Sequence, residues 1–88
     1  MTTQVQTIES EVARKLLKAW PKRSWSVKVR PAVGGKVLDV HALLVHHEGV
    51  AHVAAACIPA DLEPAEVASR FWRRVQNDIG PILRHYKV

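Results

Sequence analysis

Several residue types are scarce in this sequence, and each scarcity limits what the protein can be. A single cysteine, Cys57, excludes an internal disulfide bond. The apolar neighbours of Cys57 predict that it is a small buried side chain. No segment approaches the roughly 20 consecutive apolar residues of a membrane-spanning helix. Internal repeats, low-complexity stretches and interdomain linkers are also lacking, so residues 1–88 are expected to form a single domain.

The amino-terminal segment lacks the charged and apolar regions of a signal peptide. Residues 1–6 are polar, and we expect them to be disordered. Without an export signal, the protein is expected in the cytoplasm.

Acidic residues are few compared with basic ones. The chain has 13 Lys and Arg against 8 Asp and Glu, which gives a formal net charge of +5. Such a surplus suits a polyanionic partner, and nucleic acid is the first candidate. The alternative is that the charge only keeps a small domain soluble.

Two segments have the apolar periodicity of amphipathic helices. Residues 8–20 place their apolar side chains on one half of a helical wheel, after a cap at Thr7. A second helix is predicted after a cap at Asp61 or Glu63, and Gly80-Pro81 ends it near residue 79. The tail beyond is either a helical turn or a packed extension. The large aromatic side chains on the predicted buried surfaces are expected to pack in the core: Trp20, Trp25, Phe71 and Trp72.

Three segments between the helices have the pattern of β-strands. Residues 24–30 alternate apolar and polar side chains, and Gly34-Gly35 marks the turn that follows. Residues 36–47 and 50–58 are longer strands joined by a tight turn at Glu48-Gly49. The order predicts an α+β fold, α-β-β-β-α, with a three-stranded antiparallel sheet and two helices on one face.

The hairpin turn also predicts which side chains share a face of the sheet. If Glu48 and Gly49 are the two loop residues, His47 faces Val50 and pairing continues residue by residue from there. One face is then apolar and belongs to the core: Leu38, Val40, Ala42, Leu44, Ala51, Val53, Ala55 and Cys57. The other face is mixed: Asp39, His41, Leu43, Val45, His47, Val50, His52, Ala54, Ala56 and Ile58. A bulge or a three-residue loop would shift this register.

Three groups of side chains are candidates for function. Basic residues of the strands and helices that would contact nucleic acid are Lys22, Arg23, Lys28, Arg30, Arg70, Arg73 and Arg74. Apolar residues on the mixed face suggest that a partner covers it, and the predicted contact residues are Leu43, Val45, Val50, His52 and Ile58. The cover is a protein partner, a second copy of the chain or the carboxy-terminal tail.

The histidines of the sheet form the third group. Asp39 and His41 are two residues apart on a strand, an arrangement in which a carboxylate can orient an imidazole for general-base work. No Ser or Cys nucleophile is predicted on that face. His46 and His47 are adjacent and point apart, so they are a poor chelating pair, and we expect neither a metal nor a cofactor.

A resemblance to known proteins lies in the hairpin and the start of the last helix. Two segments carry it, 47–53 (HEGVAHV) and 61–66 (DLEPAE). Together with the element order, they resemble the double-stranded-RNA-binding-domain-like fold and, within it, HicA-type mRNA interferase toxins. Those toxins carry a catalytic His soon after a Gly at the start of the second strand. Here five residues separate Gly35 from His41. The resemblance implies ribonuclease activity that depends on His41.

The sequence therefore favours a non-enzymatic protein that binds nucleic acid or a nucleoprotein through a basic surface, with dimerisation through the outer sheet face as an option. A second hypothesis is an inhibitor of a host defence complex, similar to phage or plasmid anti-CRISPR proteins in size and lack of motif, that binds protein through the outer face. The third is the HicA-like ribonuclease.

Overall fold

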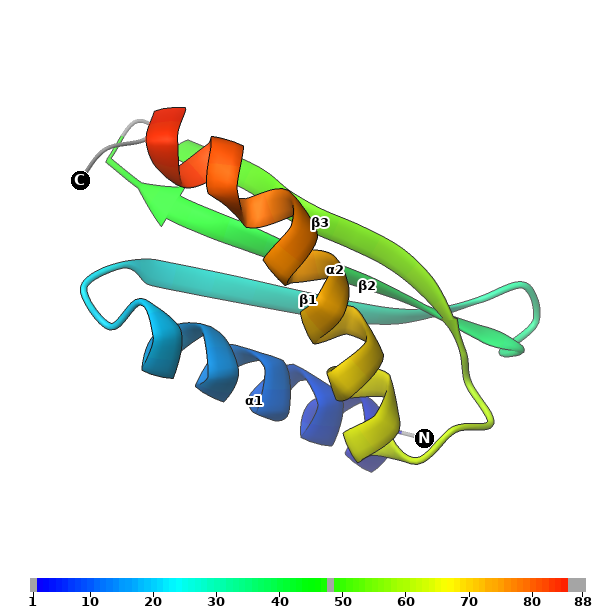
Figure 1. Cartoon of the computed structure of the whole chain (residues 1–88). Helices are drawn as coiled ribbons and strands as arrows, with labels where there is room; N and C mark the ends of the chain where they lie inside the picture. The colour runs from blue at the N-terminus through cyan, green and yellow to red at the C-terminus, as the bar shows by residue number, and fades with distance from the viewer. Residues whose placement is uncertain (1, 48, 86–88) are drawn as a thin grey trace.

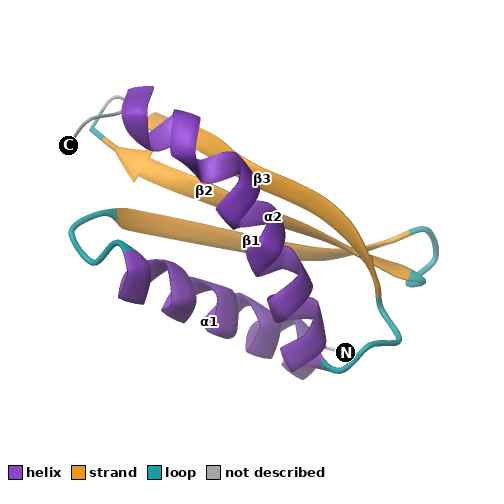
Figure 2. Ribbon diagram, viewed as in Figure 1, coloured by secondary structure: helices purple, strands orange, loops and turns teal. Residues whose placement is uncertain are grey.

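The computed structural model describes residues 2–47 and 49–85, which form a helix, three strands and a helix in chain order. The elements are α1 (Thr2–Ala19), β1 (Ser24–Ala32), β2 (Val37–His46), β3 (Gly49–Pro59) and α2 (Pro64–His85). The strands form one antiparallel sheet in the order β1-β2-β3. Both helices lie on the same face of this sheet (Figures 1 and 2). The predicted α-β-β-β-α fold is confirmed.

Helix α1 begins at Thr2, well before the start that was predicted at residue 8, so the expected cap at Thr7 is wrong. Residues 2–6, which were expected to be disordered, are helical. Tertiary contacts explain the longer helix, because Val5 packs against the core. The Gln4 side-chain amide also donates hydrogen bonds to the carbonyl oxygens of Ala60 and Leu62, both at 3.3 Å.

Helix α2 starts as predicted and ends later. The Glu63 carbonyl accepts the amide of Val67 at 3.0 Å, so Glu63 rather than Asp61 is the cap. The helix continues through Pro81 to His85, and the predicted end at Gly80-Pro81 is wrong. A proline removes one helical hydrogen bond. Here Ile82 and Leu83 pack against the core and hold the last turn.

The core lies between the helices and one face of the sheet. The largest fully buried side chains come from both helices and the central strand β2: Phe71, Ile8, Leu16, Leu44, Val12, Val40, Val67 and Val75. The three tryptophans, Trp20, Trp25 and Trp72, are partly buried and pack against this core, which confirms their predicted role. No helix within the described ranges has both the length and the apolarity needed to cross a membrane.

The turn between β1 and β2 occupies residues 33–36, where Gly34 and Gly35 were predicted to mark it. Both glycines have positive φ angles, 65° and 86°, which glycine adopts without steric cost. The Gly35 amide donates to the Ala32 carbonyl at 3.1 Å and closes the turn.

The β2–β3 hairpin has a different register from the predicted one. His46 pairs with Gly49 and Val45 with Val50, so the expected pairing of His47 with Val50 is wrong. Glu48 of the predicted turn lies outside the described residues. Further along the ladder, Leu43 pairs with His52 but Ala42 pairs with Ala54. Val53 is therefore an extra residue in β3, a β-bulge.

The bulge reverses the faces of β3 beyond Val53. Before it, Ala51 and Val53 point into the core as predicted. After it, Ala54 and Ile58 are buried, whereas Ala55 and Cys57 are exposed. The predictions that Cys57 is buried and that Ile58 faces outward are wrong, because one extra residue exchanges the two faces of a strand.

This register can be tested at two adjacent positions of β3. Ile58→Ala should lower the free energy of unfolding by about 2–4 kcal/mol, because it removes a buried side chain from the core. Cys57→Ser should change that free energy by less than about 0.5 kcal/mol, since exposed positions tolerate substitution. Urea denaturation measures both. Comparable losses at the two positions would contradict the bulge.

The contact between α1 and β1 gives a second test. The Val29 amide donates to Oε2 of Glu9 at 3.0 Å across the edge of the sheet. Glu9→Ala should therefore cost about 1–2 kcal/mol of unfolding free energy. Glu11→Ala is the matched control and should cost at most about 0.5 kcal/mol, since the contact of Glu11 within the described part of the chain is an exposed ion pair with Arg14. Equal losses would show that the Glu9 contact adds nothing.

Candidate functional site

The face of the sheet opposite the helices is the candidate site. Antiparallel pairing sets the outward side chains of the three strands side by side, with Ser26 of β1 opposite Leu43 of β2 and Leu43 opposite His52 of β3. Both helices lie on the other face (Figure 2). Of the carboxy-terminal tail, which is one of the expected covers, residues 82–85 continue α2 on that other face, and residues 86–88 lie outside the described residues. No helix of the described ranges covers the outward face.

A shallow groove crosses the middle of this open face. It has a volume of about 250 Å³ and is lined by Lys28, Arg30, Asp39, His41, Leu43 and His52. The sheet register explains the grouping, because Lys28 pairs with His41 and Arg30 pairs with Asp39. Residues i and i+2 of a strand share a face, so Lys28 and Arg30 line one wall together. Two cations, two imidazoles and one carboxylate thus converge.

The two cations of the groove are not neutralised by ion pairs. Lys28 and Arg30 are exposed, and neither forms an ion pair within residues 2–47 and 49–85. The nearby carboxylate of Asp39 contacts other groups. An anionic ligand could therefore contact Lys28 and Arg30 without breaking an ion pair, although Asp39 places one negative charge in the same groove.

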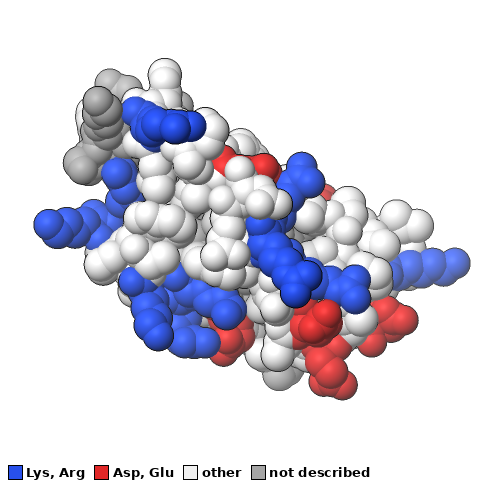
Figure 3. All heavy atoms as spheres, viewed as in Figure 1, with Lys and Arg blue, Asp and Glu red and all other residues white. Residues whose placement is uncertain are grey.

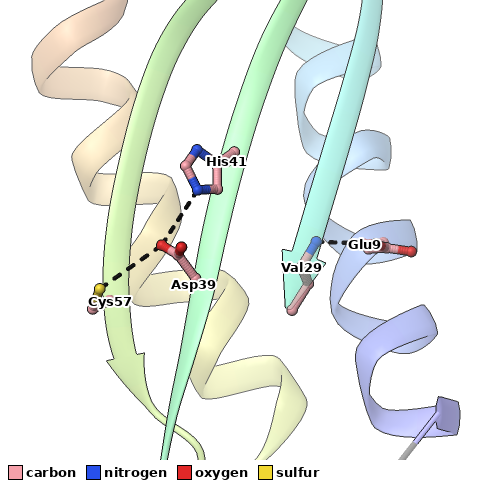
Figure 4. Close-up of polar contacts among 5 residues, drawn as sticks. All are labelled: Glu9, Val29, Asp39, His41 and Cys57. Atoms are coloured by element: carbon pink, nitrogen blue, oxygen red, sulfur yellow. Dashed lines mark hydrogen bonds and ion pairs between the residues drawn. The ribbon is translucent and has the colours of Figure 1, made fainter. Parts of the chain in front are cut away.

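Asp39 is the centre of a small polar cluster on the open face (Figure 4). Its Oδ1 atom lies 3.3 Å from Nε2 of His41. The same Oδ1 accepts a weak hydrogen bond from the Cys57 thiol, with a sulfur to oxygen distance of 3.8 Å. The predicted neighbourhood of Asp39 and His41 is therefore present. Cys57 joins them because the bulge turns it outward, away from the core position that the sequence predicts for it.

The geometry of His41 does not favour proton transfer to a bound molecule. Its Nε2 atom faces Asp39, and its Nδ1 atom is buried with no hydrogen-bond partner in the described chain. The Cys57 thiol contacts the Asp39 carboxylate, whereas the usual activating partner of a cysteine nucleophile is an imidazole. The described contacts therefore contain no Cys–His pair.

The histidine rings are arranged edge to face. The centroids of His41 and His52 are 6.0 Å apart, with an interplanar angle of 75°. Within the described residues no group of three His, Cys, Asp or Glu side chains is placed to hold a metal ion. Flat rings on an open sheet can instead stack against planar groups of a ligand.

The hairpin end of the open face is apolar. Val45 and Val50 pair directly across β2 and β3, and they are 42% and 59% exposed. Leu43 and His52 form the next pair on the same face of the sheet. Four of the five residues predicted for partner contact are thus adjacent. Ile58 is excluded, since it is only 5% exposed and belongs to the core.

The remaining predicted cations lie away from the groove. Lys22 and Arg23 follow α1 and line a separate hollow with His46 and His47 at the hairpin end. Arg70 and Arg74 of α2 form ion pairs with Glu66 at 3.1 Å and Asp78 at 2.9 Å. Figure 3, which views the helix side, shows basic side chains interspersed with acidic ones. The predicted basic set is therefore divided between opposite sides of the molecule.

Three comparisons with known proteins were made for this chain. Comparison with protein-family models, with curated proteins and with solved structures finds no match to this chain. The resemblance to proteins of the double-stranded-RNA-binding-domain-like fold therefore stays a prediction, and the chain's own side chains are what indicates its function.

Proposed function

We propose that this chain is a non-enzymatic cytoplasmic protein that binds nucleic acid, alone or within a nucleoprotein, through the open face of its sheet. The observation that carries the proposal is the pair of exposed cations without ion-pair partners in the described chain, Lys28 and Arg30, on one wall of the groove. Their side chains are separated by about 6–7 Å along the strand. Cations placed in this way neutralise phosphates and release their counterions.

The other wall of the groove suits the bases of a single strand. His41 and His52 present their rings on β2 and β3, next to the apolar side chain of Leu43. Unpaired bases stack on flat side chains, histidine among them, while basic groups contact the backbone. A single-stranded ligand exposes both kinds of surface at once.

The helix side supports binding less well than the sheet face. Arg70 and Arg74 are held by carboxylates one helical turn away. A phosphate that approached either arginine would have to compete with its partner carboxylate. Arg73 is exposed on the same helix and adds one further cation.

A second candidate function is supported by the apolar hairpin end of the open face. Leu43, Val45 and Val50 lie together there, and Val45 and Val50 are substantially exposed. Exposed apolar groups that lie together mark protein interaction sites. An inhibitor that docks on a protein complex, of phage or plasmid type, would use this end of the sheet rather than the cations.

Removal of the groove cations tests the main proposal. The double variant Lys28→Ala with Arg30→Ala should weaken binding to single-stranded RNA or DNA at least tenfold at low salt. It should also reduce the slope of log affinity against log salt by about 1.4, because two phosphate contacts are lost. Fluorescence anisotropy with labelled oligonucleotides over a salt series measures both quantities.

The matched control is Arg70→Ala with Arg74→Ala, which lowers the net charge by the same two units on the helix side. It should change affinity by less than threefold. Equal loss in the two double variants would mean that only net charge matters, and no binding by the parent chain would refute the proposal. Cleavage of the RNA by pure protein, lost in His41→Ala, would instead establish the ribonuclease.

The apolar hairpin end distinguishes the two candidate functions. Val50→Ser removes an exposed methyl pair without changing charge, so oligonucleotide affinity should stay within about twofold, since no phosphate contact is lost. In nuclease-treated cell lysate, an inhibitor would capture a protein with the parent chain and lose it with Val50→Ser. Retention of nucleic acid in untreated lysate by both chains supports the main proposal.

A further inference from the structure

The two outer edges of the sheet differ in their contacts with the helices. The strand order leaves β1 at one edge and β3 at the other. Helix α1 lies along β1 (Figures 1 and 4), and its Glu9 carboxylate accepts the outward amide of Val29 at 3.0 Å. The edge of β1 is thereby occupied at Val29. Helix α2 packs against the inner face of β3.

The direction of the β3 backbone groups follows from the contact at Val29. Since the Val29 amide points away from β2, its partner Val40 directs its own backbone groups toward β3. Val40 pairs with Ala56, so Ala56 bonds to β2. Ala55 and Cys57, the neighbours of Ala56, therefore direct their amides and carbonyls to the free edge. Neither amide has a hydrogen-bond acceptor outside the sheet in the described chain.

The composition of β3 leaves this edge unprotected. Residues 49–59 contain no Lys, Arg, Asp or Glu, although the chain carries a net charge of +5. Sheet edges are usually guarded by charged side chains, prolines or bulges. In β3 the bulge lies at Val53 and the proline at position 59, so residues 54–58 between them carry no such guard.

We propose that residues 54–58 of β3 pair with the same residues of a second copy of this chain, in antiparallel orientation, and join two sheets into one of six strands. An antiparallel strand pair has two-fold symmetry, which a homodimer requires. The contact is free of charged side chains, so it places no like charges opposite one another, although each copy carries +5 overall. Lys28 and Arg30 then lie on the two outermost strands. The pairing does not depend on nucleic-acid binding.

A single proline substitution at the edge tests the pairing. Ala55→Pro removes an amide that points to the free edge and should leave the β2–β3 ladder intact. Ala55→Ser is the matched control, because it alters the same side chain and keeps the amide. By sedimentation equilibrium the parent chain and Ala55→Ser should reach twice the 9.8 kDa of one chain as concentration rises from micromolar to millimolar. Ala55→Pro should raise the dissociation constant at least tenfold, because the symmetric contact loses its amide in both copies.

Hydrogen exchange tests the same pairing without substitution. The amides of Ala55 and Cys57 should exchange several-fold more slowly at high than at low concentration, while the Val29 amide should not change. Circular dichroism establishes whether Ala55→Pro is folded, and the exchange result decides the question if it is not. A parent chain that stays monomeric at millimolar concentration overturns the proposal, even if a foreign extended peptide binds the edge. So does a folded Ala55→Pro variant that dimerises as well as Ala55→Ser.

Discussion

Burial of two helical apolar surfaces on a single face of the sheet is the interaction on which the rest of the structure depends. Phe71 and Val75 of α2 and Leu16 of α1 are fully buried there, and each such side chain stabilises the fold by about 1.5–3 kcal/mol. With only α1 and α2 to cover three strands, the chain leaves the opposite face exposed (Figure 2). The groove, the apolar hairpin end and the polar cluster at Asp39 all lie on that exposed face. Its side chains are consequently free to contact a ligand.

The bulge at Val53 decides what that exposed face contains. It sends Ile58 into the core and turns Cys57 outward, where the thiol meets Asp39. Without the extra residue, the open face would carry another large apolar side chain and no thiol. The bulge also limits the straight part of the free β3 edge to the residues that follow it. One inserted residue thus shapes both the candidate binding face and the proposed contact between two copies.

Secondary structure decides which basic side chains of the molecule lie close to acidic ones. On α2 the arginines sit one turn from acidic residues, and Arg70 and Arg74 are held in ion pairs. On β1, alternation separates Lys28 and Arg30 from any carboxylate except Asp39, which is engaged by His41 and Cys57. The net charge of +5 alone does not distinguish these surroundings. If two copies join through β3, the pair of cations on each β1 would lie at opposite margins of one extended surface.

The sequence by itself determined the element order, the amphipathic faces of the helices and the inward pattern of β2, because local periodicity reports which side of each element is apolar. It also brought Asp39 next to His41, since residues two apart on a strand share a face. Only the tertiary structure decided the register of β3, the location of Cys57 and Ile58, and the helical state of residues 2–6 and 81–85. A bulge leaves no mark in an alanine-rich strand such as residues 51–57, where either face reads as apolar. The extended helix ends are held by distant contacts, of Gln4 with Ala60 and of Ile82 with the core, which local pattern cannot report.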